Sequence, residues 1–246
     1  MAFDDFQNQR AARSRAGAIE TDYDVGLRQH MLGVYSYMFA GLGLSGAVAF
    51  FLIQSGSSAL FFTAPGQFTA LGWVAMLAPL GLLLIASFTA QRLSVAATHG
   101  LYWSIAALQG VGLAVLFGAY TGQSITQIFL VTATAFGALS LFGYTTKRSL
   151  SGLSTFLMMG LIGVVIAFVV NMFVQSSMLQ FVASVIGVLV FAGLTAFDTQ
   201  RLKTEYLYGA LGDGAAKAQV WGALSLYLNF INLFQLLLSL FGQREE

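Results

Sequence analysis

One carboxylate, Asp198, stands apart from the other acidic residues of the chain. It is the only acidic residue between Asp24 and Glu205, and it lies where a long apolar stretch meets a basic segment. A carboxylate in such surroundings must be paired, protonated or in contact with water, because an isolated charge in an apolar medium is costly. Asp198 is therefore the first candidate for chemistry, and that chemistry is the binding and release of a proton.

Two arginines are candidate partners for Asp198. Arg201 follows three residues later, so a pair on one helix would leave Asp198 at the membrane interface, facing the lipid headgroups. Arg92 is the only basic residue between the second and third apolar segments and would lie at the same level as Asp198. Because losing one partner of a partly desolvated pair strands the other, protonation of Asp198 would release Arg92. This second alternative predicts a pH-operated latch between Asp198 and Arg92.

Polar residues along the last apolar segment form the second candidate site. Ser225, Asn229 and Asn232 follow i, i+4, i+7 spacing and share one helix face, with Gln235 about one turn further. We expect this stripe to face the protein interior, because amides without partners are costly in hydrocarbon. The stripe would provide either interhelical hydrogen bonds or the lining of a narrow hydrated path.

The composition of the chain is that of a membrane protein. Hydrophobic residues make up 57% of the 246 residues and charged residues 9%, with a mean hydropathy of +0.78, whereas soluble domains carry roughly 25% charged residues. Seven apolar segments are long enough to cross a bilayer as helices. The sequence therefore predicts an all-α, polytopic membrane protein, a seven-transmembrane-helix bundle embedded in the lipid bilayer. The expected spans are 32–53, 71–91, 101–120, 125–144, 153–174, 178–200 and 220–242.

The basic residues predict how the chain is oriented. Ten of the eleven Lys and Arg residues lie in the N-terminal segment and in the loops after the second, fourth and sixth spans, and the opposite loops carry none. The positive-inside rule then places the N-terminus in the cytoplasm. We expect a polar cytoplasmic segment over 1–30, a membrane domain over 31–242 and a short polar tail over 243–246. Seven full spans put this tail outside, whereas a re-entrant seventh segment would put it inside.

The residue inventory argues against several functions. His30 and His99 have no Cys, His or carboxylate at metal-ligand spacing, and the chain has no cysteine, so we expect no metal site. An intramembrane aspartyl protease needs two carboxylates, a serine protease needs a deep Ser–His pair, and a retinal protein needs a lysine in the last span. No basic cluster indicates a nucleic-acid partner. We expect no enzyme activity and no cofactor.

Four separated motifs resemble those of a known family. They lie at 133–138 in the fourth span, at 143–151 after it, at 197–200 (FDTQ) closing the sixth span, and at 223–234 in the seventh. With these motifs in order, the chain resembles the Bax inhibitor family (transmembrane Bax inhibitor motif), in its bacterial YccA-like branch, over residues 28–242. The resemblance implies a bacterial inner-membrane protein in which a central helix is wrapped by the other helices.

The resemblance also implies a function and a proton sensor. Family members act as pH-sensitive calcium leak channels, and some bacterial members instead modulate a membrane-bound AAA protease. The family's sensor is a pair of aspartates, in the sixth and seventh spans, with an arginine after the second span that latches onto the first. Asp198 matches the first aspartate and Arg92 matches the arginine. The expected function is a calcium leak channel gated by Asp198; the alternative is a non-conducting protein that modulates a membrane protease or a stress response.

The chain departs from the family pattern at Asn229, which stands where the second aspartate is expected. Two adjacent carboxyls repel each other, whereas an amide donates a hydrogen bond to a single carboxylate. We therefore expect any leak to open only at more acidic pH than in relatives with two aspartates, or to be governed mainly by Arg92. Calcium takes about six to eight oxygen ligands with carboxylates among them, so we expect calcium to be transported rather than held in a dedicated site.

Overall fold

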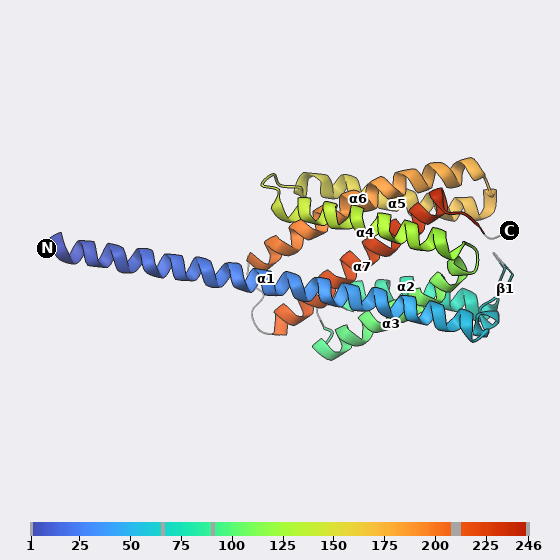
Figure 1. Ribbon diagram of the computed structural model, residues 1–246, viewed down its shortest axis with the longest axis horizontal. Coiled ribbons are helices and arrows are strands. Elements are labelled where there is room, and N and C mark those ends of the chain that lie inside the picture. Colours follow the sequence, from blue (N-terminus) through green and yellow to red (C-terminus); the bar gives the residue numbers. More distant parts are fainter. Residues whose placement is uncertain (1, 65–66, 90–91, 208–212, 245–246) are drawn as a thin grey trace.

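The chain is almost entirely helical. The computed structural model describes residues 2–64, 67–89, 92–207 and 213–244 (Figure 1). A 3₁₀ turn, Ser57–Leu60, and two short antiparallel strands, β1 (Phe62–Ala64) and β2 (Gln67–Phe68), lie between the first two helices. The expected all-α fold class is confirmed. The described α-helices are α1 (Ala2–Gln54), α2 (Ala70–Thr89), α3 (Val95–Phe117), α4 (Gly122–Thr145), α5 (Ser151–Val174), α6 (Ser177–Leu207) and α7 (Asp213–Phe241).

Six of the described helices are long and apolar enough to cross a bilayer. They contain the candidate spans Val25–Gln54, Val95–Phe117, Gly122–Thr145, Ser151–Val174, Ser177–Tyr206 and Gly214–Phe241. This confirms a polytopic membrane protein. The second of the seven expected spans falls on α2, whose apolar part, Ala70–Ala86, is shorter. About 17 residues is the lower limit for crossing the hydrocarbon core, so the crossing by α2 stays a prediction.

The connections between helices gather at two ends of the bundle. The α2–α3 and α4–α5 connections and the start of α7 lie at one end, which we call the basic end because Arg92, Lys147 and Lys217 lie there (Figure 1). The α3–α4 and α5–α6 connections and the residues after α7 lie at the other, the C-terminal end. Since α7 is one helix between these ends, it does not turn back as a re-entrant segment would. The cytoplasmic position of the basic end stays a prediction.

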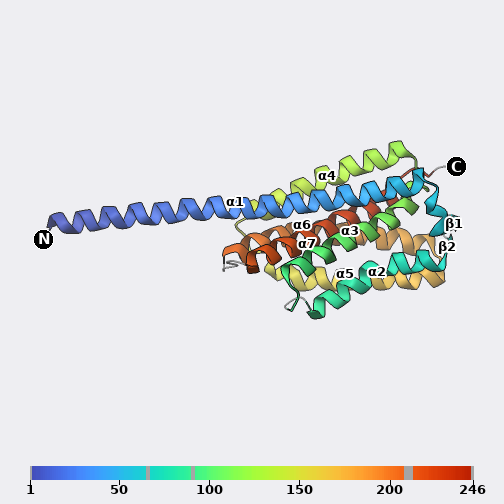
Figure 2. The same ribbon diagram turned by 90° about the horizontal axis from the view of Figure 1, so that it is seen from below.

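Helix α1 joins two regions that the sequence predicted as separate. It begins at Ala2 and ends at Gln54, so the predicted boundary at residue 30 falls inside a helix, close to Val25, where the candidate span begins. The first part of α1 projects alone beyond the bundle, and its later part packs against α3 and α7 (Figures 1 and 2). The division into a cytoplasmic segment, a membrane domain and a tail stays a prediction.

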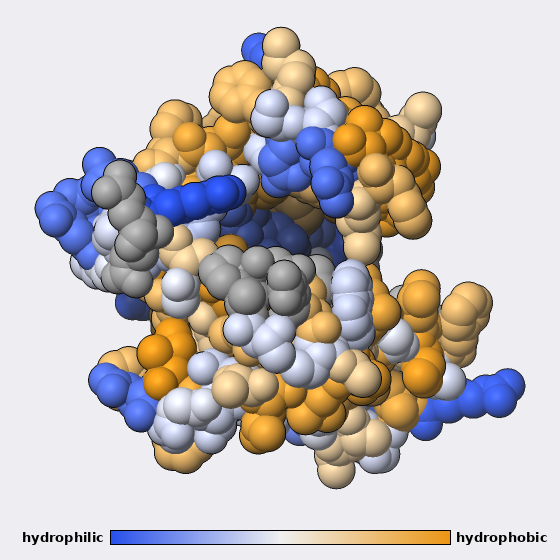
Figure 3. All heavy atoms as spheres, turned by 90° about the vertical axis from the view of Figure 1, so that its right-hand side faces the viewer, coloured by the Kyte–Doolittle hydropathy of each residue, from blue (hydrophilic) through white to orange (hydrophobic). Residues whose placement is uncertain are grey.

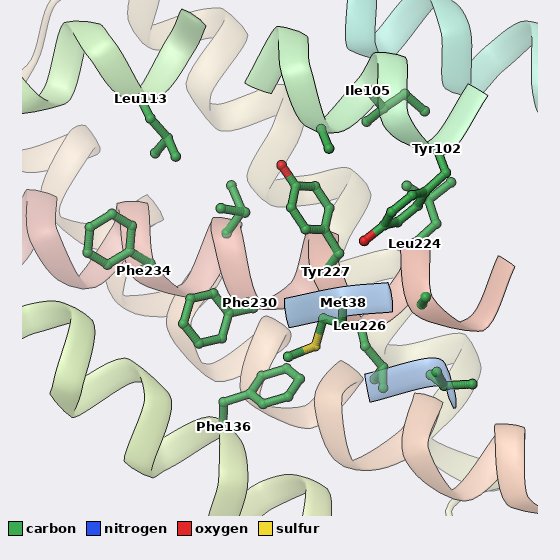
Figure 4. Packing of buried hydrophobic residues seen from close by; sticks show 14 of the residues in the cluster. Met38, Tyr102, Ile105, Leu113, Phe136, Leu224, Leu226, Tyr227, Phe230 and Phe234 are labelled. Atoms are coloured by element: carbon green, nitrogen blue, oxygen red, sulfur yellow. The ribbon is translucent and has the colours of Figure 1, made fainter. Parts of the chain in front are cut away.

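Helix α7 is the most buried of the candidate spans. In its most apolar 18-residue stretch 61% of the residues are buried, against 11% to 39% in the other five. Tyr227, Phe230 and Phe234 belong to a core shared with α1, α3 and α4, as Figure 4 shows, whereas Leu233 and Leu236 belong to a core shared with α5 and α6. Because the bilayer is as apolar as these side chains, this packing stabilises the bundle mainly through van der Waals contact.

Two glycines bring neighbouring helices into close contact. A Cβ atom on Gly143 of α4 would lie 2.2 Å from the carbonyl oxygen of Ala196 in α6, and one on Gly110 of α3 would lie 2.7 Å from that of Ser45 in α1. A larger residue at either position would push the helices apart, as expected for small residues at membrane helix contacts. The close approach of α4 to α6 lies two residues before Asp198 and fixes that part of α6.

Candidate functional site

Asp198 lies buried on α6 where this helix faces α7. It is 5% exposed, and three side chains contact its carboxylate. Asn229 Nδ2 donates a hydrogen bond to Oδ2 at 2.7 Å, Ser225 Oγ donates to the same oxygen at 3.0 Å, and Arg201 Nη1 lies 3.2 Å from Oδ1. These donors replace the water molecules that a carboxylate otherwise requires. We call these four residues the Asp198 cluster.

Helical spacing brings the Asp198 cluster together. Asp198 and Arg201 are three residues apart on α6, and Ser225 and Asn229 are four residues apart on α7, so each pair shares one helix face. The two helices pack along each other, and these faces meet. The contact between α6 and α7 therefore combines hydrogen bonds to a buried carboxylate with the apolar packing around them, and the ion pair lies within α6.

Arg201 connects the buried carboxylate to the surface of the basic end. Its Nη2 donates to Ser225 Oγ at 3.4 Å, and its Nε lies 3.4 Å from Glu205 Oε1, one turn further along α6. The side chain of Arg201 is 40% exposed and that of Glu205 is 56% exposed. Arg201 is thus shared between a buried carboxylate and an exposed one, and it retains a partner if the contact with Asp198 is lost.

The structure pairs Asp198 with Arg201, and the expected latch between Asp198 and Arg92 stays a prediction. Both residues lie in the described part of the chain, and the ion pair of Asp198 is with Arg201. Arg92 is exposed in the α2–α3 connection, and α2 packs chiefly against α3 rather than α6. The physical reason is proximity: Arg201 is already one turn away on the same helix and needs no tertiary movement to reach Asp198. The proton-sensing role of the site stays a prediction.

The predicted polar stripe of α7 divides between two surroundings. Asn229 is buried against Asp198, whereas Ser225, Asn232 and Gln235 are half-buried. Asn232 Nδ2 donates to the carbonyl oxygen of Leu228 in its own helix at 2.7 Å, so this amide does not bridge to another helix. Ser225 and Asn229 therefore form interhelical hydrogen bonds, and Asn232 does not.

The half-buried polar residues lie on the least covered face of α7. Ser225, Asn232 and Gln235 are separated by seven and then three residues, and the exposed Ser239 follows four residues later, so all lie on one face. Seen from the C-terminal end, the molecule is hollowed near its middle, with hydrophilic residues in the depth of the hollow and on part of its rim (Figure 3). Polar groups in such a position suit contact with water rather than with lipid.

A row of hydroxyl groups beside the Asp198 cluster was not predicted. Thr199 Oγ1 lies 3.0 Å from Ser140 Oγ, and Ser140 Oγ also contacts the hydroxyl of Tyr35. This row links α6 to α4 and α1 beside the buried carboxylate. The sequence gives little sign of it, because Ser and Thr in helices commonly bond their own backbone, as Thr199 also does with the carbonyl oxygen of Thr195 at 2.8 Å.

The two histidines lie outside the Asp198 cluster and contact aromatic rings. The ring of His30 lies 5.2 Å from that of Tyr206, and the ring of His99 lies 5.3 Å from that of Tyr37, between centroids. Across the ranges that the structure describes, no three His, Cys, Asp or Glu side chains come together as metal ligands.

Comparison with known proteins identifies relatives along nearly the whole chain. A family model described as "Inhibitor of apoptosis-promoting Bax1" matches residues 27–246. An uncharacterized protein of Caulobacter vibrioides is 46% identical, covering 98% of this chain and 99% of the relative. The inner membrane protein YbhL of Escherichia coli is 43% identical, covering 89% and 93%. An uncharacterized protein of Rickettsia prowazekii is 40% identical, covering 91% and 93%.

A double-mutant cycle tests which arginine is coupled to Asp198. Combining Asp198→Asn with Arg201→Gln should show a coupling of about 1 kcal/mol in the free energy of unfolding, because the ion pair is partly buried. Combining Asp198→Asn with Arg92→Gln, the matched control, should show almost none, since Arg92 is exposed. The measurement is denaturation of the four proteins of each cycle in detergent. A larger coupling with Arg92 than with Arg201 would contradict the observed pairing.

Proposed function

The chain belongs to the Bax inhibitor family of membrane proteins, and on that premise we propose that it is a pH-sensitive cation leak pathway with calcium as the transported ion. The observation that carries this proposal is the position of Arg201, which Asp198 holds beside Ser225 at the basic end of the polar face of α7. Its expected location is the cell inner membrane, since the relative YbhL is an inner membrane protein. In this proposal α2 is the second of seven spans and α7 is the central helix.

The polar face of α7 supplies the proposed path. Ser225, Asn232 and Gln235 lie along the helix face that neighbouring helices cover least, and they lead from the C-terminal end toward Asp198. Neutral amides and hydroxyls bind a cation weakly, and a leak pathway requires binding that is weak enough for the ion to leave. The hydrophilic hollow seen from the C-terminal end is consistent with the outer mouth of this path (Figure 3).

Arg201 is the proposed barrier in the closed state. A guanidinium at a narrow polar passage repels cations, and Asp198 holds it there. Protonation of Asp198 removes the negative charge that attracts Arg201, so Arg201 would turn toward Glu205 and the aqueous phase. The nearby Lys203 points elsewhere, because its Nζ donates to the carbonyl oxygen of Tyr144 at 2.9 Å. Arg201 is therefore the charged group that gates the path in this proposal, in place of Arg92.

Asn229 sets the pH range in which this gate responds. Its amide donates to Asp198 Oδ2 at 2.7 Å, at the position where the family resemblance implies a second aspartate. An aspartate in that place would put a second carboxyl beside Asp198, and two adjacent carboxyls repel each other, whereas an amide and a carboxylate do not. Opening is therefore expected at more acidic pH here than in a variant with two carboxyls.

Calcium flux through the purified protein in liposomes tests the gate. Flux should rise as the pH falls, Asn229→Asp should shift this rise toward neutral pH, and Asp198→Asn should leak at neutral pH because it cannot hold Arg201. The control is Asn171→Asp, which adds a carboxylate on α5, outside the Asp198 cluster and the polar face of α7, and it should move the profile less. If Asn229→Asp leaves the pH dependence of flux unchanged, the proposed role of the contact between Asn229 and Asp198 is refuted. If no variant conducts calcium, the proposed channel is refuted.

The alternative function is a non-conducting protein that modulates a membrane protease or a stress response. The observation that favours it is the first part of α1, which projects alone beyond the bundle and is free to meet a partner (Figures 1 and 2). The sequence of this part mixes both charge signs, with Arg10, Arg13 and Arg15 among acidic residues.

Deletion of residues 2–24 separates the two functions. If the projecting helix recruits a partner, the deletion should abolish the effect on that partner in cells while the pH-dependent flux in liposomes stays unchanged. The membrane protein fraction is measured alongside, because the deletion must leave the amount of inserted protein the same. Loss of flux together with unchanged partner effects would contradict this division of roles.

A further inference from the structure

An apolar recess lies on the opposite side of α7 from the Asp198 cluster. It has a volume of about 210 Å³ and is bounded by residues of α1, α3, α4 and α7. Figure 4 shows Phe230 and Phe234 on α7, with Leu113 above them on α3. The main walls are Gly46, Phe117, Ile125, Phe129, Phe230 and Phe234.

The lining of this recess disfavours water. Its one hydroxyl-bearing residue is Thr126, whose Oγ1 donates to the carbonyl oxygen of Gly122 at 2.9 Å and so is already satisfied. Apolar cavities of this kind stay dry and take up apolar molecules; an engineered cavity of about 150 Å³ binds benzene. An empty recess would forfeit van der Waals contacts on all its walls. An apolar occupant is therefore favoured.

The recess is continuous with the lipid-facing surface of the candidate spans. Phe129, one of its walls, is 42% exposed, and the next residue on α4, Leu130, is exposed to the surroundings of the bundle. The lining residues of α3 and α4 lie near the connection between these helices, toward the C-terminal end. A bilayer places acyl chains against this opening, in the leaflet at the C-terminal end.

A cation is held at the same end of the bundle as the recess. Thr121 N donates to the carbonyl oxygen of Gln243 at 3.0 Å, and Gln243 N donates to Ser124 Oγ at 2.9 Å. These bonds hold the exposed Arg244 against the α3–α4 connection, with its guanidinium 5.9 Å from the ring centre of Tyr120. Tyr120 and Ser124 are close in sequence to the walls of the recess, three residues after Phe117 and directly before Ile125.

We infer that this recess and Arg244 together form a binding site for one phospholipid of the leaflet at the C-terminal end. One acyl chain fills the recess between α1 and α4, and the headgroup phosphate pairs with Arg244. Arginine suits a phosphate because its planar guanidinium donates two parallel hydrogen bonds, and Tyr120 provides the interfacial aromatic ring typical of this depth. The site is independent of the proposed gate.

Photolabelling in vesicles tests the site. The protein is placed in phosphatidylcholine vesicles that contain a small fraction of phosphatidylglycerol with a diazirine on one acyl chain, and labelled residues are mapped by mass spectrometry. Peptides containing Phe129 and Phe234 should be labelled more strongly than the peptide containing Phe173, which is 84% exposed on α5 and reports ordinary lipid contact. Equal labelling at all three would overturn the inference.

Paired variants separate the acyl contact from the phosphate contact. Gly46→Leu should fill the recess and reduce labelling there to the level at Phe173, whereas Gly43→Leu, on the same helix, should not; a Cβ meets open space at both glycines. Thr126→Phe fills the recess from α4 instead, so it tests the same acyl contact if Gly46→Leu fails to fold. Labelling that persists in both filled variants would overturn the acyl site.

The headgroup contact has its own pair of variants. Arg244→Gln should lower labelling by the phospholipid about fivefold, as expected for the loss of about 1 kcal/mol from an exposed charge pair. Lys147→Gln, at the basic end, should leave labelling unchanged. A diacylglycerol with the same photoreactive chain but no phosphate should be insensitive to Arg244→Gln. Equal sensitivity of both lipids would overturn the role of Arg244.

Discussion

The need to satisfy one buried carboxylate fixes the arrangement of the two helices at the heart of the molecule. Asp198 has little access to water, so its charge depends on Arg201, Ser225 and Asn229. Two of these donors come from α7, and the third lies one turn along α6. A rotation or slide of either helix would leave the carboxylate with fewer donors, which is costly in an apolar environment. The interaction therefore sets the register between α6 and α7 as well as the chemistry of the site.

The two sides of α7 carry different chemistry. One face is polar, half-buried and ends near Arg201, whereas the other contributes aromatic side chains to the core and to the apolar recess. The polar face favours contact with water, and the apolar face favours contact with hydrocarbon, because burying polar groups in hydrocarbon without partners is costly. This division explains how one helix can carry a proposed ion path and a proposed lipid site without either disturbing the other.

Local sequence patterns predicted much of the fold and of the Asp198 cluster, and tertiary contacts decided the remaining features. The contrast between Asp198 and its acid-free surroundings singled out the carboxylate, and helical spacing put Ser225 and Asn229 on one face. Spacing offered Arg201 as one of two partners for Asp198, but the distance of Arg92 from Asp198 depended on which helices pack together, and spacing does not reveal that. The lengths of the apolar stretches also underestimated the lengths of α6 and α7, because each helix continues through polar residues beyond one end of its apolar stretch. The place of Arg244 follows from contacts with a connection about 120 residues earlier in the chain, so no local signal pointed to it.

The chain contains no cysteine, so a single cysteine reports directly on whether the polar face of α7 is wetted. The decisive measurement is the rate at which a membrane-impermeant thiol reagent modifies Gln235→Cys from each side of the membrane, at neutral and at acidic pH. Phe156→Cys, on the exposed outer surface of α5, is the lipid-facing reference. Modification from the C-terminal side at both pH values, and from the basic side only at acidic pH, is the predicted result. A rate for Gln235→Cys no greater than that for Phe156→Cys would contradict a hydrated path closed by Arg201.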